Sequence, residues 1–192
     1  MSKRLGLVID QERCIGCEAC TVACKIENNS IGHRIQVETQ NVPQKDTPSG
    51  QYPDVKLEWL LRLCNHCANP PCVDACPNDA LIKREDGPVI YEEKKCDGCQ
   101  ACVNACPYNV ILYIQEKNII EKCNLCVHRI DKGLEPFCVI CCEGQAIFFG
   151  DLNDPNSLVS QKIGSREVFQ LKPEVGTSPS VYYCPPKPRR RL

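Results

Sequence analysis

The fold of this protein is decided by the stretch KKCDGCQACVNACPYNV (94–110), in which four cysteines follow the spacing C-x2-C-x2-C-x3-C and a proline follows the last. The same spacing recurs in CIGCEACTVAC (14–24), and CNHCANPPCVDAC (64–76) keeps it with a longer middle gap. A fourth group lies in CNLCVHRIDKGLEPFCVICC (123–142), where a long gap precedes the last cysteines. A motif that recurs four times indicates a duplicated structural unit.

Cysteine is the extreme feature of the composition, with 18 among 192 residues. A disulfide scaffold is disfavoured because it belongs to oxidised secreted chains, and no secretion signal is visible. Structural zinc is disfavoured because its four ligands usually come as two paired C-x2-C knuckles. The spacing in 96–107, with its final proline, is the bacterial ferredoxin signature, in which three thiolates hold one 4Fe-4S cube and the fourth cysteine binds a second cube. Soft thiolates at this density therefore indicate iron-sulfur clusters.

Charge and hydropathy exclude two classes of partner. The net charge is −1, with 23 Lys and Arg against 24 Asp and Glu, so no nucleic-acid partner is expected. The basic segment KPRRRL (187–192) is expected to be a solvated end. The apolar run before Asp10 is too short for a signal peptide, and no stretch approaches the roughly 18 apolar residues of a spanning helix. Direct membrane insertion is not expected.

Short β-branched and apolar runs flank the cysteine motifs and predict strands. These runs are RLGLVID (4–10), DALIK (79–83), GPVIYEE (87–93), NVILYI (109–114) and QAIFFGD (145–151). We therefore predict an α+β fold of two nested bacterial-ferredoxin-like modules.

The order of the motifs predicts how the two modules divide the chain. The inner module spans 62–111, and the outer module combines 1–28 with 112–150. Residues 29–61 form an inserted loop or hairpin, and 151–192 form a C-terminal extension that is predicted to be a turn followed by an extended tail.

Two adjacent cysteines compete for the last place in the fourth group. The segments CPNDALI from Cys76, CPYNVIL from Cys106 and CEGQAIF from Cys142 all carry Ala or Val four residues after the cysteine, followed by two apolar residues. The gap from Cys138 to Cys142 also matches the last gap of the other motifs. Cys142 is therefore predicted to be the ligand and Cys141 a bystander.

The remaining candidate ligands are three histidines and one cysteine. His66, inside the second motif, could replace a thiolate, but four cysteines already surround it, so a supporting or solvated role is expected. His33 and His128 lie in polar surroundings and are expected at the surface. Cys184 has no motif around it and is expected to be a lone thiol in the tail.

The four groups in this order, with KCNLCVHRIDKGLEPFC (122–138) followed by FGDLNDPNS (149–157), resemble the iron-sulfur electron-transfer subunit of the dimethyl sulfoxide reductase family. Thiosulfate, polysulfide, tetrathionate and respiratory arsenate reductases have similar subunits. The resemblance implies four 4Fe-4S clusters, with the last cysteine of each motif crossing to the partner cluster. The implied ligand sets are Cys14, Cys17, Cys20 with Cys142; Cys24 with Cys123, Cys126, Cys138; Cys64, Cys67, Cys72 with Cys106; and Cys76 with Cys96, Cys99, Cys102.

Two positions bear on how closely the sequence follows that family. Some relatives hold a 3Fe cluster because a non-ligand replaces the residue matching Cys99, so its presence here implies four cubes. Relatives usually have proline after the last ligand, whereas this sequence has Glu143. Losing the proline frees a backbone N–H and adds a carboxylate close to the cluster of Cys142. Both change its potential, and the direction stays open, although negative charge alone would lower it.

The resemblance also implies a function and a set of partners. Such a subunit is not catalytic by itself; it passes single electrons between a large subunit with a molybdenum or tungsten bis-pterin cofactor and a quinol-linked membrane anchor or soluble carrier. It would be peripheral to the membrane, exported with a signal-bearing partner, or else cytoplasmic. The alternatives are a freestanding polyferredoxin, a coupling protein for carbon monoxide dehydrogenase, hydrogenase or formate dehydrogenase, and a structural metal protein without redox turnover.

Overall fold

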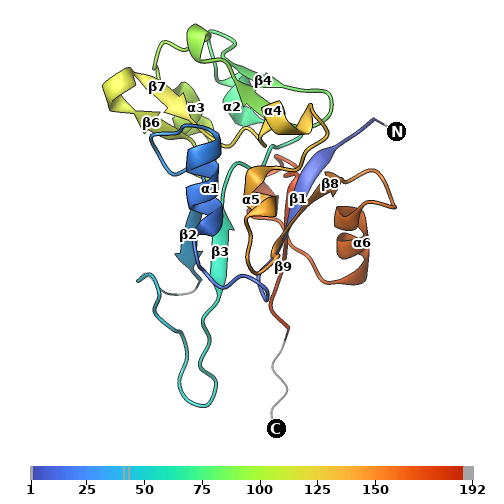
Figure 1. Ribbon diagram of the computed structural model, residues 1–192. Helices are drawn as coiled ribbons and strands as arrows, with labels where there is room; N and C mark the ends of the chain where they lie inside the picture. The colour runs from blue at the N-terminus through green and yellow to red at the C-terminus, as the bar shows by residue number, and fades with distance from the viewer. Residues whose placement is uncertain (1, 41, 43, 188–192) are drawn as a thin grey trace.

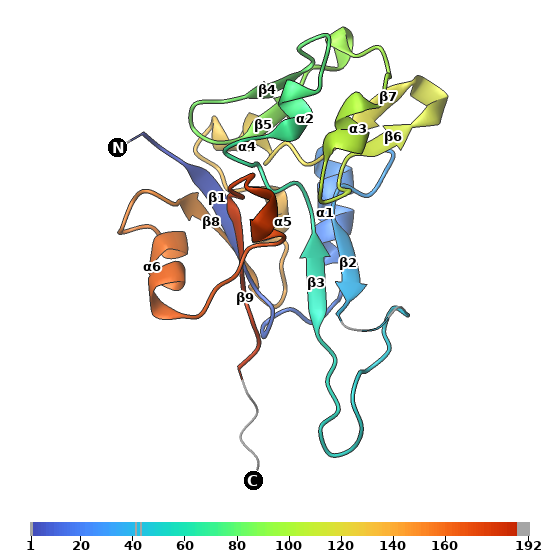
Figure 2. The same cartoon turned by 180° about the vertical axis from the view of Figure 1, so that it is seen from behind.

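The computed structural model describes residues 2–40, 42 and 44–187 (Figures 1 and 2). Short helices and four small sheets make up an α+β fold, as predicted. Most of the basic segment KPRRRL, residues 188–192, lies outside the described range. In the described part of the chain, no helix combines the length and the apolar character that crossing a membrane requires.

The largest sheet is built around the first strand, β1 (Leu5–Asp10), every residue of which is buried. β1 pairs antiparallel with β8 (Ile147–Asp151), placing Leu5 opposite Asp151, and parallel with β9 (Val181–Cys184). Helix α6 (Leu158–Ser165) packs on β1 and β8. The sheet thus joins the two ends of the chain to the segment that follows the fourth cysteine group.

Three antiparallel hairpins account for the other strands. β2 (Gln36–Thr39) pairs with β3 (Trp59–Arg62), β4 (Leu81–Lys83) with β5 (Val89–Tyr91), and β6 (Leu112–Ile114) with β7 (Ile119–Glu121). Strands β1, β4, β5, β6 and β8 fall in the runs predicted from sequence. The long loop between β2 and β3 projects away from the rest of the molecule in both views (Figures 1 and 2).

Five short helices begin inside the cysteine motifs. They are α1 (Ala19–Glu27), α2 (Pro71–Asp74), α3 (Ala101–Ala105), α4 (Val127–Ile130) and α5 (Phe137–Ile140). One-turn 3₁₀ helices occur at Glu93–Lys95, Gln115–Lys117 and Pro173–Val175. Helices α1 and α5 pack against each other, which brings the first motif beside the end of the fourth (Figure 1).

The C-terminal extension differs from the prediction of a turn and an extended tail. The turn leads into helix α6, whose N-cap Ser157 accepts a hydrogen bond from the Ser160 amide. The extension then ends in strand β9, where Tyr183 and Cys184 are fully buried. Cys184 therefore packs in a sheet instead of lying in a tail, because its strand finds a partner far away in sequence, β1.

Candidate metal centres

Each cysteine motif has a left-handed residue at the same place. It is the second residue between the first two cysteines of the motif, with φ of 71° at Gly16, 45° at His66, 76° at Gly98 and 56° at Leu125. Glycine tolerates this conformation without steric cost. At Gly16 space also requires glycine, because an added Cβ would collide with the Trp59 ring. The four loops therefore share one backbone conformation, although only two of them use glycine for it.

Three cavities are each lined by four of the predicted ligand cysteines. Each cavity takes three cysteines from one motif and one from another. The first cavity is lined by Cys14, Cys17, Cys20 and Cys142, the second by Cys64, Cys67, Cys72 and Cys106, and the third by Cys76, Cys96, Cys99 and Cys102.

The other four predicted ligands gather between helices α1, α4 and α5. Cys24, Cys123, Cys126 and Cys138 are all buried. The Asn28 side-chain amide lies 3.7 Å from Sγ of Cys24 and 3.8 Å from Sγ of Cys126. Burial raises the pKa of the Cys138 thiol well above its usual value, and the neighbouring Cys123, Cys126 and Cys24 raise it further. These four thiols therefore lie together in space as one more set of four, the group of Cys24.

The pKa values of the buried thiols depend on the other thiols of the same group. Burial, followed by the nearest thiol of the same group, raises the pKa of Cys20 and Cys72 to about 12 and that of Cys24 and Cys102 to about 11. Such thiols stay protonated at neutral pH unless a bound cation displaces the proton. Buried thiols in groups of four are thus suited to binding a soft metal centre, which supplies the missing positive charge.

Polar groups near the thiols fit an iron-sulfur cluster. Asn65 is 1% exposed and lines the cavity of Cys64, and among the described residues neither atom of its side-chain amide has a hydrogen-bond partner. A buried amide normally finds a partner, and the sulfur atoms of a cluster would accept its N–H. Backbone amides already donate to cluster-type thiols, at 3.3 Å from Leu125 to Cys123 and 3.4 Å from Gly98 to Cys96.

The register of the fourth motif is visible in its backbone. The Ala80 amide donates to Sγ of Cys76 and the Ala146 amide to Sγ of Cys142, both at 3.2 Å. The residue before the donor, Asp79 or Gln145, has a positive φ in both motifs. Cys142 lines the cavity of the first motif, whereas Cys141 is not part of that lining. This geometry favours Cys142 over Cys141, and the assignment of ligands to clusters stays a prediction.

The histidines and Glu143 differ in how well the sequence placed them. His33 and His128 are exposed, as predicted. The prediction that His66 could be solvated is wrong, because the side chain is fully buried and its Nδ1 accepts a hydrogen bond from the Val89 amide at 3.0 Å. Burial holds the pKa of His66 well below its usual value. Glu143 is exposed, so solvent screens its charge from the cavity nearby.

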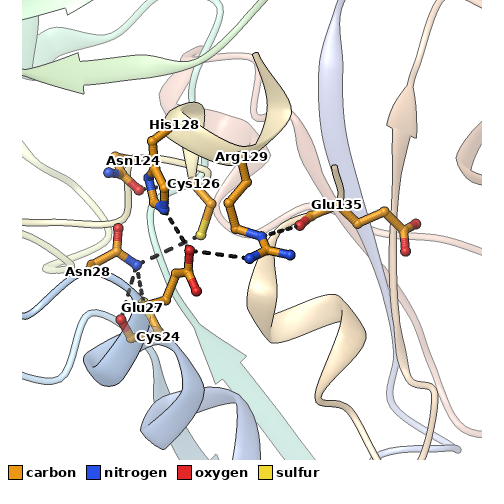
Figure 3. A network of polar contacts seen from close by, with 8 residues as sticks. All are labelled: Cys24, Glu27, Asn28, Asn124, Cys126, His128, Arg129 and Glu135. Atoms are coloured by element: carbon orange, nitrogen blue, oxygen red, sulfur yellow. Dashed lines mark hydrogen bonds and ion pairs between the residues drawn. The ribbon is translucent and has the colours of Figure 1, made fainter. Parts of the chain in front are cut away.

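A polar network joins helix α1 to helix α4 beside the fourth group (Figure 3). The Glu27 carboxylate lies 2.7 Å from Nε2 of His128 and 3.3 Å from a guanidinium nitrogen of Arg129. The hydrogen bond from His128 lowers the pKa of Glu27, and Arg129 acts in the same direction. Sequence spacing did not point to Asn28 or Asn65, because neither belongs to a repeated pattern of ligand residues.

Comparison with known proteins agrees with this geometry. Residues 55–152 match the family model of a 4Fe-4S dicluster domain, and residues 5–26 match that of a 4Fe-4S binding domain. The sequence is 44% identical to the B subunit of tetrathionate reductase from Salmonella typhimurium, over 94% of this chain and 72% of that protein. It is 36% identical to the arsenate respiratory reductase iron-sulfur subunit of a Shewanella species, over 94% and 95% of the two proteins.

A third relative is the B subunit of polysulfide reductase from Wolinella succinogenes, 36% identical over 97% of each protein. Identity at this level over nearly the whole length, together with the two 4Fe-4S models, is sufficient to assign a family. This protein belongs to the family of iron-sulfur B subunits of the dimethyl sulfoxide, tetrathionate, arsenate and polysulfide reductases.

Proposed function

We propose that the chain is the electron-transfer subunit of a molybdenum or tungsten bis-pterin oxidoreductase and carries single electrons along four 4Fe-4S clusters. The observation that carries this proposal is the burial pattern of the thiol groups. The eight cysteines around Cys24 and Cys64 are all buried, whereas the other two groups each contain an exposed cysteine, Cys17 or Cys99. An electron-transfer chain needs this arrangement of two buried clusters between two partly exposed ones, because electrons enter and leave only at its ends.

Contacts between groups support a linear order of the four clusters. The first motif supplies cysteines to two groups, and the charge of Cys20 is felt at Cys138. The charge of Cys64 likewise raises the pKa of Cys123, which indicates that the group of Cys24 lies beside the group of Cys64. The second and third motifs share the remaining two groups through Cys76 and Cys106. The proposed order begins at the group of Cys17, passes through those of Cys24 and Cys64, and ends at the group of Cys99.

In this proposal, the ligand sets are those implied by the family. Two nested ferredoxin-like modules would hold them, the outer one made of 1–28 and 112–150 and the inner one of 62–111. The pairing of β1 with β8 supports the outer module, and the β4–β5 hairpin supports the inner one. The clusters supply one-electron chemistry, while the chain contributes burial, hydrogen bonds and fixed positions.

The proposed partners are a large pterin-binding catalytic subunit at one end of the line and a quinol-linked membrane anchor or soluble carrier at the other. The names of the relatives, which are B subunits of reductases, support a catalytic partner. Under this proposal the protein is peripheral to the membrane, and substrate specificity belongs to the large subunit.

Purification of the intact complex tests the proposal. We expect about sixteen irons per chain from four cubes, four reducible clusters in an electron paramagnetic resonance titration, and a co-purifying pterin subunit. A chain that holds zinc, or fewer than three reducible clusters, would contradict the proposal. Four clusters in a chain that purifies alone or with a hydrogenase, carbon monoxide dehydrogenase or formate dehydrogenase would favour the polyferredoxin or coupling-protein alternative.

A further inference from the structure

Lys122 is a buried lysine at the junction of the two shielded thiol groups. It is 2% exposed and directly precedes Cys123, a member of the group of Cys24. Its Nζ lies 3.9 Å from Sγ of Cys64, a member of the next group. The same nitrogen donates to the carbonyl oxygens of Val89 and of Cys123, the latter at 2.9 Å. One ammonium group thus touches residues of both groups.

The charge of Lys122 has no acidic partner in the described part of the chain, where every ion pair involves other residues. Its neighbour Glu121 turns away and accepts from the amides of Ile31 and Gly32 at 2.9 Å. A buried charge is costly unless an opposite charge compensates it. Two carbonyl dipoles solvate the ammonium group without neutralising it, so the missing negative charge must come from the thiolates and what they hold.

Geometry alone places this charge against the thiols, with Nζ of Lys122 3.9 Å from Sγ of Cys64. By contrast, Lys83, another lysine near this group, is only partly buried and donates to the carbonyls of His66 and Gly87. Lys122 is therefore the cation placed to act on both groups with little solvent screening.

We propose that Lys122 raises the reduction potentials of the two inner clusters together and so keeps them close enough in energy for electrons to pass between them. This inference rests on the proposed function. A cube held by four thiolates is an anion, and reduction adds one more negative charge to it. A fixed positive charge stabilises the reduced form more than the oxidised form, which favours uptake of the electron at both neighbouring clusters.

The test is a redox titration of the iron-loaded chain, followed by electron paramagnetic resonance, in Lys122→Gln and Lys122→Arg. Glutamine keeps an N–H donor for the two carbonyls but removes the charge, whereas arginine keeps the charge. In Lys122→Gln we expect two of the four reduction equilibrium constants to fall at least tenfold, about 59 mV for a one-electron couple. The other two should stay unchanged, and Lys122→Arg should keep values near those of the wild type.

Lys25→Gln is the matched control. Lys25 also lies next to a cysteine of an inner group, Cys24, and loses the same charge, but its side chain is exposed. We expect less than a twofold change in any equilibrium constant, because water and salt screen an exposed charge. An equal shift in the two variants would overturn the proposal, since adjacency in sequence would then suffice without burial.

Other outcomes also decide the matter. Unchanged potentials in a fully loaded Lys122→Gln chain would refute the inference while leaving the proposed function intact, whereas a wild-type chain without four clusters would refute the proposed function first. If Lys122→Gln lost iron, a loaded Lys122→Arg with near-wild-type potentials would support the proposal, because a positive charge at this position would then keep both the clusters and their potentials. Loss of iron from Lys122→Arg as well would overturn it in favour of packing.

Discussion

At the scale of single residues, Cys141 and Cys142 give the sharpest test of the ligand register. Cys142 lines a cavity with Cys14, Cys17 and Cys20, and its Sγ accepts from the Ala146 amide. We predict that Cys142→Ala removes one cluster, so the iron content falls by about a quarter. Cys141→Ala should keep the full content. Iron and sulfide analysis of both purified variants checks this, and the opposite pattern would place the register one residue earlier.

Asn28 offers a second prediction at this scale. Its side-chain N–H group donates to the Cys24 carbonyl at 3.0 Å and approaches the sulfurs of Cys24 and Cys126 (Figure 3). Hydrogen bonds to cluster sulfurs favour the reduced form. A neutral hydrogen bond contributes about 1 kcal/mol, or about 40 mV. Asn28→Leu should therefore lower one potential by roughly that amount, and Asn28→Asp should lower it further by adding negative charge.

The measurement is a redox titration of the loaded variants, with iron content as the control for intact clusters. The predicted order of potentials is wild type, then Asn28→Leu, then Asn28→Asp. A fully loaded Asn28→Leu chain with the potential of the wild type would mean that the amide does not act on the thiolates. Because Asn28 lies at the end of α1, away from the Cys64 group, the potential of that group should not move.

Residues that repeat could be predicted from the sequence, but residues defined by burial could not. The sixteen ligand candidates follow from spacing, because a cube needs thiolates at fixed steps along a tight loop. Three basic residues, Arg13, Lys95 and Lys122, each precede the first cysteine of a motif. Arg13 and Lys95 are exposed, while Lys122 is buried between two groups. Lys122 differs from the other two through its contacts with the Val89 carbonyl and the Cys64 thiol, which lie far away in sequence.

At the scale of elements, strand β9 joins the C-terminal extension to both the large sheet and strand β3. The Tyr183 ring is fully buried and stacks on Phe169, and its hydroxyl donates to the Leu61 carbonyl at 2.8 Å. We predict that Tyr183→Phe costs about 1 kcal/mol through the lost hydrogen bond and that Tyr183→Ala costs about 3–5 kcal/mol through the cavity left behind. Thermal unfolding under anaerobic conditions at a fixed scan rate measures both.

The same strand leads out of a segment that covers the second motif. The amides of Ala68 and Asn69 donate to the carbonyls of Ser178 and Thr177, and the Ser180 amide donates to Asn65. Loosening β9 in Tyr183→Ala should therefore also speed the loss of iron from the Cys64 group in air. A Tyr183→Ala chain that unfolds at the wild-type temperature would show that the extension is not part of the core.

Local strands could be predicted, and long-range ones could not. β1, β4, β5, β6 and β8 are short apolar runs beside the motifs, so composition alone marks them. The segment of β9 is predicted as part of an extended tail because the stretch from residue 151 on is poor in cysteine. Its parallel pairing with β1 joins residues about as far apart as the chain allows. Helix α6 follows a segment rich in turn formers, and its capping serine was not distinguished from the turn itself.

At the scale of the whole molecule, the cysteines form a large part of the core. Ten of the sixteen candidate ligands are buried, and they lie in one cluster with aliphatic side chains such as Leu7, Leu61 and Ile120. The hydrophobic cluster at the centre of the molecule includes cysteines from all four motifs. Iron and sulfide between these cysteines would neutralise part of the thiolate charge. Without them the interior holds sets of buried thiols that repel one another on ionisation.

We therefore predict that removing iron unfolds the chain as a unit instead of emptying a rigid scaffold. Metal binding energy is folding energy when a site does not exist in the unfolded chain, and without metal the buried thiols at the centre of the molecule lose the ligand that joins segments far apart in sequence. Anaerobic chelation should abolish the cooperative thermal transition and increase the binding of a hydrophobic dye, and reconstitution with iron and sulfide should reverse both changes. A sham treatment without chelator controls for handling. If the iron-free chain kept its circular dichroism spectrum and a sharp thermal unfolding transition, the strands and hairpins alone would stabilise the fold, and the clusters would not be needed for folding.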